Sequence, residues 1–309
     1  MRLLNTQWSW TAEAIAFTRA IHHLYESPAV FEDDVAIDLL SPAARCLCRS
    51  EFLYKRLIEP AFAGMRPMIF HSFSCQRYTE DQLTLTRRRR KQYVILGAGL
   101  DSFALRRQKR GAALRVFEVD QPESQEVKQR RIARSRHATP ANLEFVAVNF
   151  EVESVLDGLA RSSFDFGQPA FCAWLGTVPY LTEDAVFATL DAIAALKPGS
   201  ELVLNYLAPD ESLSAPDREF MSSLEWKLRL GSAPLRCEFA PDTIATRVCE
   251  LGFDILAHLT SKELDDRYLQ GWEGLQTIPS GRLLHLQVAA RTSREPRWRR
   301  RSRPSRLGR

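Results

Sequence analysis

Zinc-type cysteine spacing and long apolar segments are both absent from this 309-residue sequence. The six cysteines form no CxxC pair, and no cluster of Cys and His has the spacing of a zinc site. We therefore expect no metal site, and thiols that stay reduced. No run of 18 apolar residues occurs, and residues 1–10 lack the apolar core of a secretion signal. These absences predict a soluble protein of the cytoplasm that does not enter a membrane.

An excess of positive charge is absent outside the last residues of the chain. The formal net charge is +4, but residues 291–309 hold nine Arg and one Glu, so that residues 1–290 are near −4. A folded domain that binds nucleic acid would carry its basic charge on one face. We therefore expect no specific nucleic-acid partner. The tail at 291–309, rich in Arg, Ser and Pro, is expected to be a disordered appendage.

The sequence does contain a clear change of pattern along its length. Residues 1–90 have apolar positions at helical spacing, which predicts a helical N-terminal extension. Residues 91–290 alternate short apolar strands with helices, which is typical of a doubly wound, mostly parallel sheet. Strands are expected at 93–96, 114–120, 144–150, 170–175, 201–207, 253–258 and 283–290, the late pair forming an antiparallel edge. Helices are expected at 12–22, 50–58, 100–108, 124–134, 182–197 and 242–251, and a helical pattern is present around 218–230. The insertion at 208–240 and the N-terminal helices are expected to form a lid that sets the acceptor.

The most informative turn reads Gly97-Ala98-Gly99 and lies between an expected strand and an expected helix. The backbone N–H groups of such a turn can approach a ligand closely, beside the positive end of a helix. The same pattern also occurs as a plain tight connection. In the dinucleotide fingerprint the sixth position is Gly or Ala, whereas this chain has Ser102 there. This difference disfavours NAD without excluding it.

Asp120 ends the second expected strand, about twenty residues after the glycine turn. A carboxylate in this place can accept hydrogen bonds from both ribose hydroxyls of a nucleoside cofactor. It can also cap the next helix, which begins at Gln121-Pro122. Asp120 therefore indicates a nucleoside cofactor but does not distinguish S-adenosylmethionine from NAD.

Three segments carry a resemblance to a known family: VILGAGLDS at 94–102, VFEVDQP at 116–122 and WLGTVPYLT at 174–182. They resemble the leucine carboxyl methyltransferase superfamily, and most closely its bacterial branch of S-adenosyl-L-methionine-dependent methyltransferases. The resemblance covers roughly residues 10–290. It implies an α/β Rossmann-like class I methyltransferase fold, with a mostly parallel seven-stranded sheet that has an antiparallel edge. It also implies S-adenosyl-L-methionine as the cofactor.

Carried onto this sequence, the resemblance places six residues around the cofactor: Gly97 and Gly99 at its methionine end, Arg77 at its carboxylate, Asp120 at its ribose, and Asn149 and Phe150 at its adenine. The planar, permanently charged guanidinium of Arg77 suits a carboxylate. The chain departs from the family at Asn149, where an acid is usual, and after Trp174, where a Glu is frequent. The second departure weakens any transfer of the protein-carboxyl-methylating activity.

Methyl transfer from a sulfonium requires mainly that the acceptor, the methyl group and the sulfur be held in line. A carboxylate acceptor needs no general base, whereas a hydroxyl acceptor benefits from one. No His lies in an obvious catalytic setting, so no catalytic residue is assigned. The substrate-site candidates are residues expected near the carboxyl ends of strands: Tyr180, Asn205 and Tyr206.

These observations predict an O- or carboxyl-directed methyltransferase that acts on a small molecule. Two alternatives stay open. One is a relative that binds the cofactor without catalysis. The other is an NAD-dependent oxidoreductase, which the lack of a Tyr-xxx-Lys pair disfavours. Neither the acceptor nor the oligomeric state can be deduced from the sequence.

Overall fold

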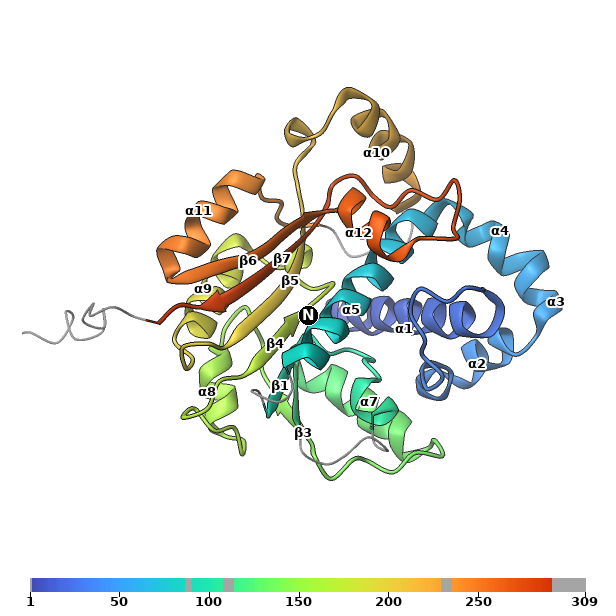
Figure 1. Cartoon of the computed structure of the whole chain (residues 1–309). Coiled ribbons are helices and arrows are strands. Elements are labelled where there is room, and N and C mark those ends of the chain that lie inside the picture. The colour runs from blue at the N-terminus through green and yellow to red at the C-terminus, as the bar shows by residue number, and fades with distance from the viewer. Residues whose placement is uncertain (1, 87–90, 108–113, 229–234, 291–309) are drawn as a thin grey trace, which may run out of the picture.

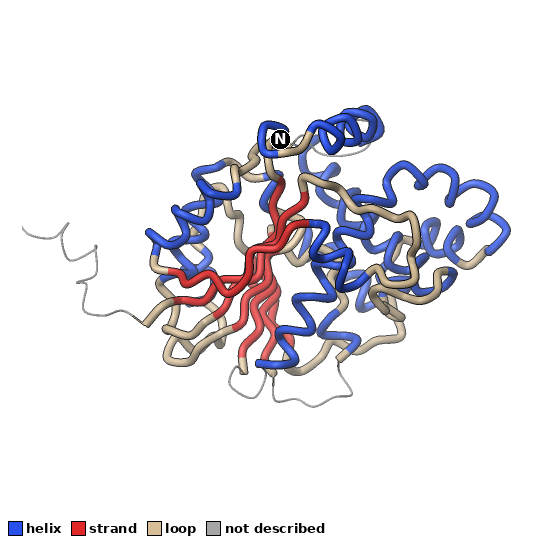
Figure 2. Tube along the Cα trace, turned by 45° about the horizontal axis from the view of Figure 1, so that its top comes forward, coloured by secondary structure: helices blue, strands red, loops and turns tan. Residues whose placement is uncertain are grey.

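The computed structural model describes residues 2–86, 91–107, 114–228 and 235–290, and the tail at 291–309 lies outside these residues. A seven-stranded sheet forms its centre, in the order β3-β2-β1-β4-β5-β7-β6. The strands are β1 (Gln92–Leu96), β2 (Arg115–Asp120), β3 (Leu143–Ala147), β4 (Phe171–Trp174), β5 (Glu201–Leu207), β6 (Phe253–Thr260) and β7 (Gly281–Val288). Figure 2 shows the strands, in red, running through the middle of the molecule with helices on both sides.

Several helices precede the first strand, and further helices alternate with the strands along the chain (Figure 1). The N-terminal part contains α1 (Arg2–Tyr25), η1 (Ala36–Leu39), α2 (Pro42–Cys48), α3 (Glu51–Leu53), η2 (Tyr54–Ile58), α4 (Glu59–Phe62), η3 (Ala63–Met65) and α5 (Arg66–Thr86). The part after β1 contains α6 (Phe103–Arg106), α7 (Pro122–Ala133), α8 (Val155–Ala160), η5 (Val178–Tyr180), α9 (Glu183–Ala194), η6 (Asp210–Ser212), α10 (Ala215–Leu228), α11 (Pro241–Leu251) and α12 (Ser261–Tyr268). Among the described residues, no helix is both long and apolar enough to cross a membrane.

Strand pairing confirms the expected sheet. β1 lies parallel to β2 and β4, and the parallel part continues to β3 on one side and β5 on the other. β7 is inserted antiparallel between β5 and β6, and forms the expected antiparallel edge. The structure therefore has the predicted class I arrangement, and its central strands β1 and β4 are neighbours.

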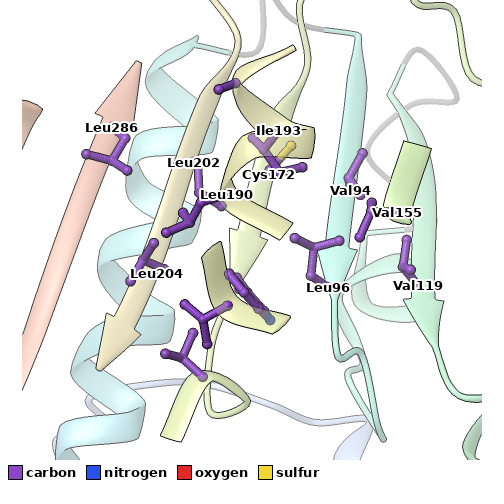
Figure 3. Packing of buried hydrophobic residues seen from close by; sticks show 14 of the residues in the cluster. Val94, Leu96, Val119, Val155, Cys172, Leu190, Ile193, Leu202, Leu204 and Leu286 are labelled. Atoms are coloured by element: carbon purple, nitrogen blue, oxygen red, sulfur yellow. The ribbon is translucent and has the colours of Figure 1, made fainter. Parts of the chain in front are cut away.

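Both faces of the sheet are buried, which explains why its central strands read as continuous apolar runs. The side chains of successive β1 residues point to opposite faces of the sheet. Val94 and Leu96 pack in one core, and Tyr93 and Ile95 pack in the other. The first core includes side chains of α8, α9 and α11, and part of it is shown in Figure 3. The second core includes side chains of α5, α6 and α12.

Several elements are shorter than the sequence pattern predicts, and in two of them a side-chain contact marks the change. The helix expected over 100–108 is confined to α6 within the described residues, because the Asp101 carboxylate accepts the N–H of Phe103 at 2.7 Å and the helix begins there. The strand expected over 144–150 ends at Ala147. There the side-chain oxygen of Asn149 accepts the N–H of Glu151 at 3.1 Å and turns the chain.

Two helices, α8 and α12, have no counterpart among the elements expected from the sequence. The start of α12 carries a capping box in which the Thr260 hydroxyl accepts the N–H of Glu263 and the Glu263 carboxylate accepts the N–H of Thr260. The Thr-x-x-Glu spacing is visible in the sequence and is the signal for this helix. The six residues of α8 are too few to show a helical period.

A buried ion pair joins β2 to α7. The side chains of Glu118 and Lys128 are only 1% and 2% exposed, and they contact each other directly. Burial raises the pKa of Glu118 to about 7, above the ordinary value of 4.5. A carboxyl with a raised pKa contributes stability at acid pH and loses that contribution as the pH rises through about 7. Lys128 is the positive partner that allows Glu118 to ionise inside the protein.

We expect Lys128→Met to lower the free energy of unfolding by about 3–5 kcal/mol near pH 8, because it leaves a buried carboxylate unpaired. The loss should be smaller near pH 5, where Glu118 can take up a proton. Urea unfolding at both pH values measures this difference. Arg130→Met on the same helix is the control, because its partner Glu126 is 72% exposed and such pairs contribute about 0–1 kcal/mol. Equal losses for the two variants would contradict this account.

Candidate functional site

The carboxyl ends of β1 and β4 lie side by side in the middle of the sheet. The chain continues from β1 to α6 on one face, and from β4 to α9 on the opposite face. In open α/β sheets, ligands bind outside the strand ends at such a reversal of strand order. The loops that follow these strands, at 97–102 and 175–177, therefore mark the candidate site.

The turn after β1 packs tightly against the loop after β4. Gly97 has φ +67°, a left-handed conformation that favours glycine. A Cβ on Gly97 would lie only 2.1 Å from Oγ1 of Thr177. Gly99 is also left-handed, with φ +46°, and a Cβ there would lie 3.3 Å from the Cβ of Ala12. The structure thus requires glycine at position 97, and helix α1 covers the turn at Gly99.

The end of β2 holds this turn through hydrogen bonds. The N–H of Gly97 donates to the carbonyl of Val119 at 2.8 Å. The N–H of Gly99 donates to Oδ2 of Asp120 at 2.6 Å, and the N–H of Gln121 donates to Oδ1 at 2.7 Å. Burial raises the pKa of Asp120, although these two N–H donors oppose the rise. Asp120 is therefore the residue that joins the glycine turn to β2 and α7.

Asn149 and Phe150 lie just beyond the end of β3. The side-chain oxygen of Asn149 accepts the N–H of Glu151, as described above, and its amide nitrogen has no bond to the fold among those described. Phe150 is buried, and its ring centroid lies 6.1 Å from that of Trp174. Trp174 is fully buried in the core, and its Nε1 has no hydrogen-bond partner among the described residues. This edge of the site is therefore mainly apolar.

Arg77 does not contact the glycine turn. Its Nε donates to the carboxylate of Asp81, one turn further along α5, at 3.1 and 3.2 Å, and its side chain is 46% exposed. The neighbouring Gln76 is the residue that reaches the turn, where its Nε2 donates to Oδ2 of Asp101 at 3.0 Å. The contact predicted between Arg77 and the cofactor's carboxylate stays a prediction.

The substrate-site candidates on β5 point in opposite directions, as successive residues of a strand do. Asn205 accepts the N–H of Gly176 at 2.7 Å, and so holds the loop after β4. Tyr206 belongs to the core with α9 and α11, and its hydroxyl lies 2.6 Å from Nε2 of His258. Tyr180 is partly exposed in η5, which follows the loop after β4. The structure thus brings Asn205 to the loop and turns Tyr206 away from it.

Sequence reasoning missed Thr177 and Gln76, which both touch the glycine turn. Thr177 lies in the segment WLGTVPYLT, which carries the family resemblance, but neither residue's contact with the turn can be deduced from the sequence, because each reaches the turn from a distant part of the chain. Thr177 approaches from the loop after β4, and Gln76 approaches from α5. Such contacts depend on how distant elements pack against each other, and local sequence patterns do not predict this packing.

The residues at these strand ends fit a nucleoside cofactor. Each oxygen of the Asp120 carboxylate accepts one backbone N–H and retains capacity for a second donor, which matches the two hydroxyls of a ribose. The glycines at 97 and 99 add no side chain of their own to the turn, and both have the left-handed backbone that favours glycine. In the described ranges, no group of three His, Cys, Asp or Glu residues is arranged to hold a metal ion.

Comparison with known proteins shows the family of this chain. The model of the leucine carboxyl methyltransferase family matches residues 12–194, which is more than half of the chain. A Bacillus subtilis (strain 168) protein named "Putative S-adenosyl-L-methionine-dependent methyltransferase YktD" is 27% identical over 283 residues, covering 84% of this chain and 91% of that protein. A Mycobacterium avium (strain 104) protein named "Putative S-adenosyl-L-methionine-dependent methyltransferase" is 31% identical over 199 residues, covering 63% of this chain and 57% of that protein.

A solved structure supports the fold. The structure of a DUF574-family protein from Streptomyces avermitilis superposes with a TM-score of 0.55. The match covers 87% of this chain and 96% of that chain, at 14% sequence identity. At this identity the likeness concerns the fold alone.

Proposed function

The chain belongs to the leucine carboxyl methyltransferase family, and from that premise we propose that this S-adenosyl-L-methionine-dependent methyltransferase methylates an oxygen atom of a small molecule. The proposal places the cofactor at the carboxyl ends of β1 and β2. The observation that carries this placement is the Asp120 carboxylate, which is fixed by the N–H groups of Gly99 and Gln121 and retains an acceptor position on each oxygen.

In this proposal, each part of the site has a separate task. Asp120 accepts the ribose hydroxyls, the backbone of Gly97 and Gly99 borders the methionine end, and Asn149 and Phe150 border the adenine. Asn149 offers a neutral amide there instead of a carboxylate. S-adenosyl-L-methionine supplies a methyl group already activated on a sulfonium, so that the protein's task is to align the acceptor and to exclude water.

The polar groups near β5 favour a carboxylate as the acceptor. A general base for a hydroxyl acceptor needs a pKa near the working pH. Burial raises the pKa of Tyr180 above its ordinary value of 10, and it raises the pKa of Tyr206 as well. The histidine beside these groups, His258, lies with its Nε2 2.6 Å from the Tyr206 hydroxyl, and so belongs to the side of β5 that is turned away from the loop after β4. A carboxylate is already ionised and needs none of these groups.

A methylation assay with separate acceptor panels tests the proposal. The protein is incubated with S-adenosyl-L-methionine labelled in its methyl group, and with either small carboxylic acids or small phenols and alcohols. We expect label in the carboxylic-acid panel, in a product that mild alkali hydrolyses to methanol, as it does an ester. An alkali-stable ether would place the reaction on a hydroxyl, and label on nitrogen, carbon or the protein itself would contradict the proposal.

We propose that Arg77 exchanges Asp81 for the cofactor's carboxylate when the cofactor binds. Its position next to Gln76, which contacts the turn, supports this role. We expect Arg77→Ala to weaken binding of S-adenosylhomocysteine about tenfold, the effect of one charge-assisted hydrogen bond of about 1.5 kcal/mol. Asp81→Asn frees the guanidinium and should leave the affinity equal or higher. Isothermal titration measures both, and an unchanged Kd for Arg77→Ala would leave Arg77 as a surface partner of Asp81 only.

A further inference from the structure

A buried carboxylate contacts the segment that follows the glycine turn. Asp33, in the loop before η1, is fully buried. Its Oδ1 accepts the N–H groups of Val35 at 3.2 Å and Ala36 at 2.9 Å, and so it shapes its own loop. Its Oδ2 accepts the hydroxyl of Ser102 at 2.6 Å. Asp33 therefore links the N-terminal part of the chain to the residue at which the glycine turn ends.

Arg19 of α1 connects the same carboxylate to the turn itself. Its side chain is 4% exposed, and its Nε lies 3.3 Å from Oδ2 of Asp33. Its Nη2 donates to the carbonyl of Leu100 at 2.6 Å. Leu100 directly follows Gly99, so this bond holds the backbone at the end of the turn, next to the N–H group that Asp120 accepts. A guanidinium can make both contacts at once because its donors form a rigid fork.

Further charges extend this cluster to α5. Nε of Arg106 donates to the Ser102 hydroxyl at 2.9 Å, and its guanidinium also contacts the Glu80 carboxylate. Glu80 pairs in addition with Arg107 at 3.0 Å. Arg106 is 8% exposed, and its guanidinium carbon lies 4.8 Å from the ring centroid of Phe31. The cluster thus joins α1, the loop before η1, α6 and α5 around one end of the turn.

Stability alone does not account for such a cluster. Apolar side chains of similar volume generally hold buried elements together at least as well as charges, because desolvation offsets the attraction between buried ions. Charges with several fixed donors instead impose one geometry. Such a constraint acts on residues 100–102, because in the described part of the chain the hydrogen bonds from the end of β2 reach only Gly97, Ala98 and Gly99.

From these contacts we infer that Arg19 and Asp33 are positioning residues for the cofactor: they hold residues 100–102 in the conformation that receives it. The N-terminal extension then helps to form the cofactor-binding part of the site, in addition to any role as a lid over the acceptor. This inference rests on the proposed placement of the cofactor at the glycine turn. It is independent of which acceptor the enzyme uses.

Binding of S-adenosylhomocysteine tests this inference, because it requires no acceptor. We expect Asp33→Asn to weaken binding at least tenfold in isothermal titration of the full chain, at a temperature well below its Tm. Arg19→Lys keeps the charge but loses the fork, so its Kd should lie between the values of wild type and Asp33→Asn. Ser102→Ala removes a single hydroxyl, and it provides a milder variant if Asp33→Asn does not fold, with a Kd raised about threefold.

Ile244→Ala provides the control for lost stability. Ile244 is fully buried on α11, which packs on β6 at the far edge of the sheet. This variant should lower the Tm without changing the Kd by more than twofold. If Asp33→Asn or Ser102→Ala lowers the Tm but binds as tightly as wild type, the cluster is only structural and the inference is wrong. If wild type itself does not bind S-adenosylhomocysteine, the placement of the cofactor fails instead.

Discussion

Asp120→Asn is expected to weaken binding of S-adenosylhomocysteine about 100-fold. The variant loses the charge that would strengthen the bonds from both ribose hydroxyls, and hydrogen bonds to a charged group contribute about 1.5–3 kcal/mol each. The amide also has only one oxygen for the two N–H donors, Gly99 and Gln121, that the carboxylate now accepts. One of these N–H groups would face an NH₂ group, which disturbs the turn as well.

Isothermal titration measures this effect, with Glu126→Gln as the matched control. Glu126 lies on α7, close to Asp120 in the sequence, and is 72% exposed beside Arg130. The Glu126→Gln substitution removes one negative charge from the same region and leaves the turn unchanged. The Kd of this variant should therefore stay within twofold of the wild-type value. A Kd for Asp120→Asn equal to that of Glu126→Gln would place the ribose elsewhere.

Gly97→Ala is expected to lower the free energy of unfolding by roughly 2–6 kcal/mol, combining about 1–3 kcal/mol of backbone strain with about 1–3 kcal/mol of overpacking. The strain arises because φ is +67° at this position. The overpacking arises because the new methyl group would overlap Oγ1 of Thr177. If the variant folds, the turn and the loop after β4 must separate, and cofactor binding should be lost with the stability.

Gly199→Ala separates these two causes. Gly199 also has a left-handed conformation, with φ +85°, but a Cβ there would meet nothing within 4 Å. It lies in the connection before β5, at the amino end of the sheet. Urea unfolding should therefore show the strain alone, roughly 1–3 kcal/mol, with cofactor affinity unchanged. If Gly97→Ala costs no more than Gly199→Ala, the close approach of Thr177 has no energetic effect.

The fold was largely predictable because its strands are buried on both faces. Their apolar runs, the glycine turn and Asp120 at a strand end indicated the parallel sheet, and the family match of residues 12–194 confirms the resemblance seen in three short segments. Element ends were less predictable. The helix after the turn begins only at Phe103, where the Asp101 carboxylate accepts the N–H of Phe103, and no apolar periodicity reveals a contact of this kind.

The candidate site was predictable only where a motif carried it. Gly97, Gly99 and Asp120 lie together as the motifs imply, since strands β1 and β2 are adjacent. Thr177, Arg19 and Asp33 were not predicted, because they reach the turn from segments far away in the sequence. Arg77 was predicted from the resemblance alone, and the structure pairs it with Asp81.

We propose that S-adenosyl-L-methionine binds across the carboxyl ends of β1 and β2. A crystal structure of the full chain with S-adenosylhomocysteine tests it most directly. The account predicts both ribose hydroxyls on the Asp120 carboxylate, the methionine end at Gly97 and Gly99, and the adenine next to Phe150. Density for the ligand elsewhere, or a ribose without contact to Asp120, would contradict it.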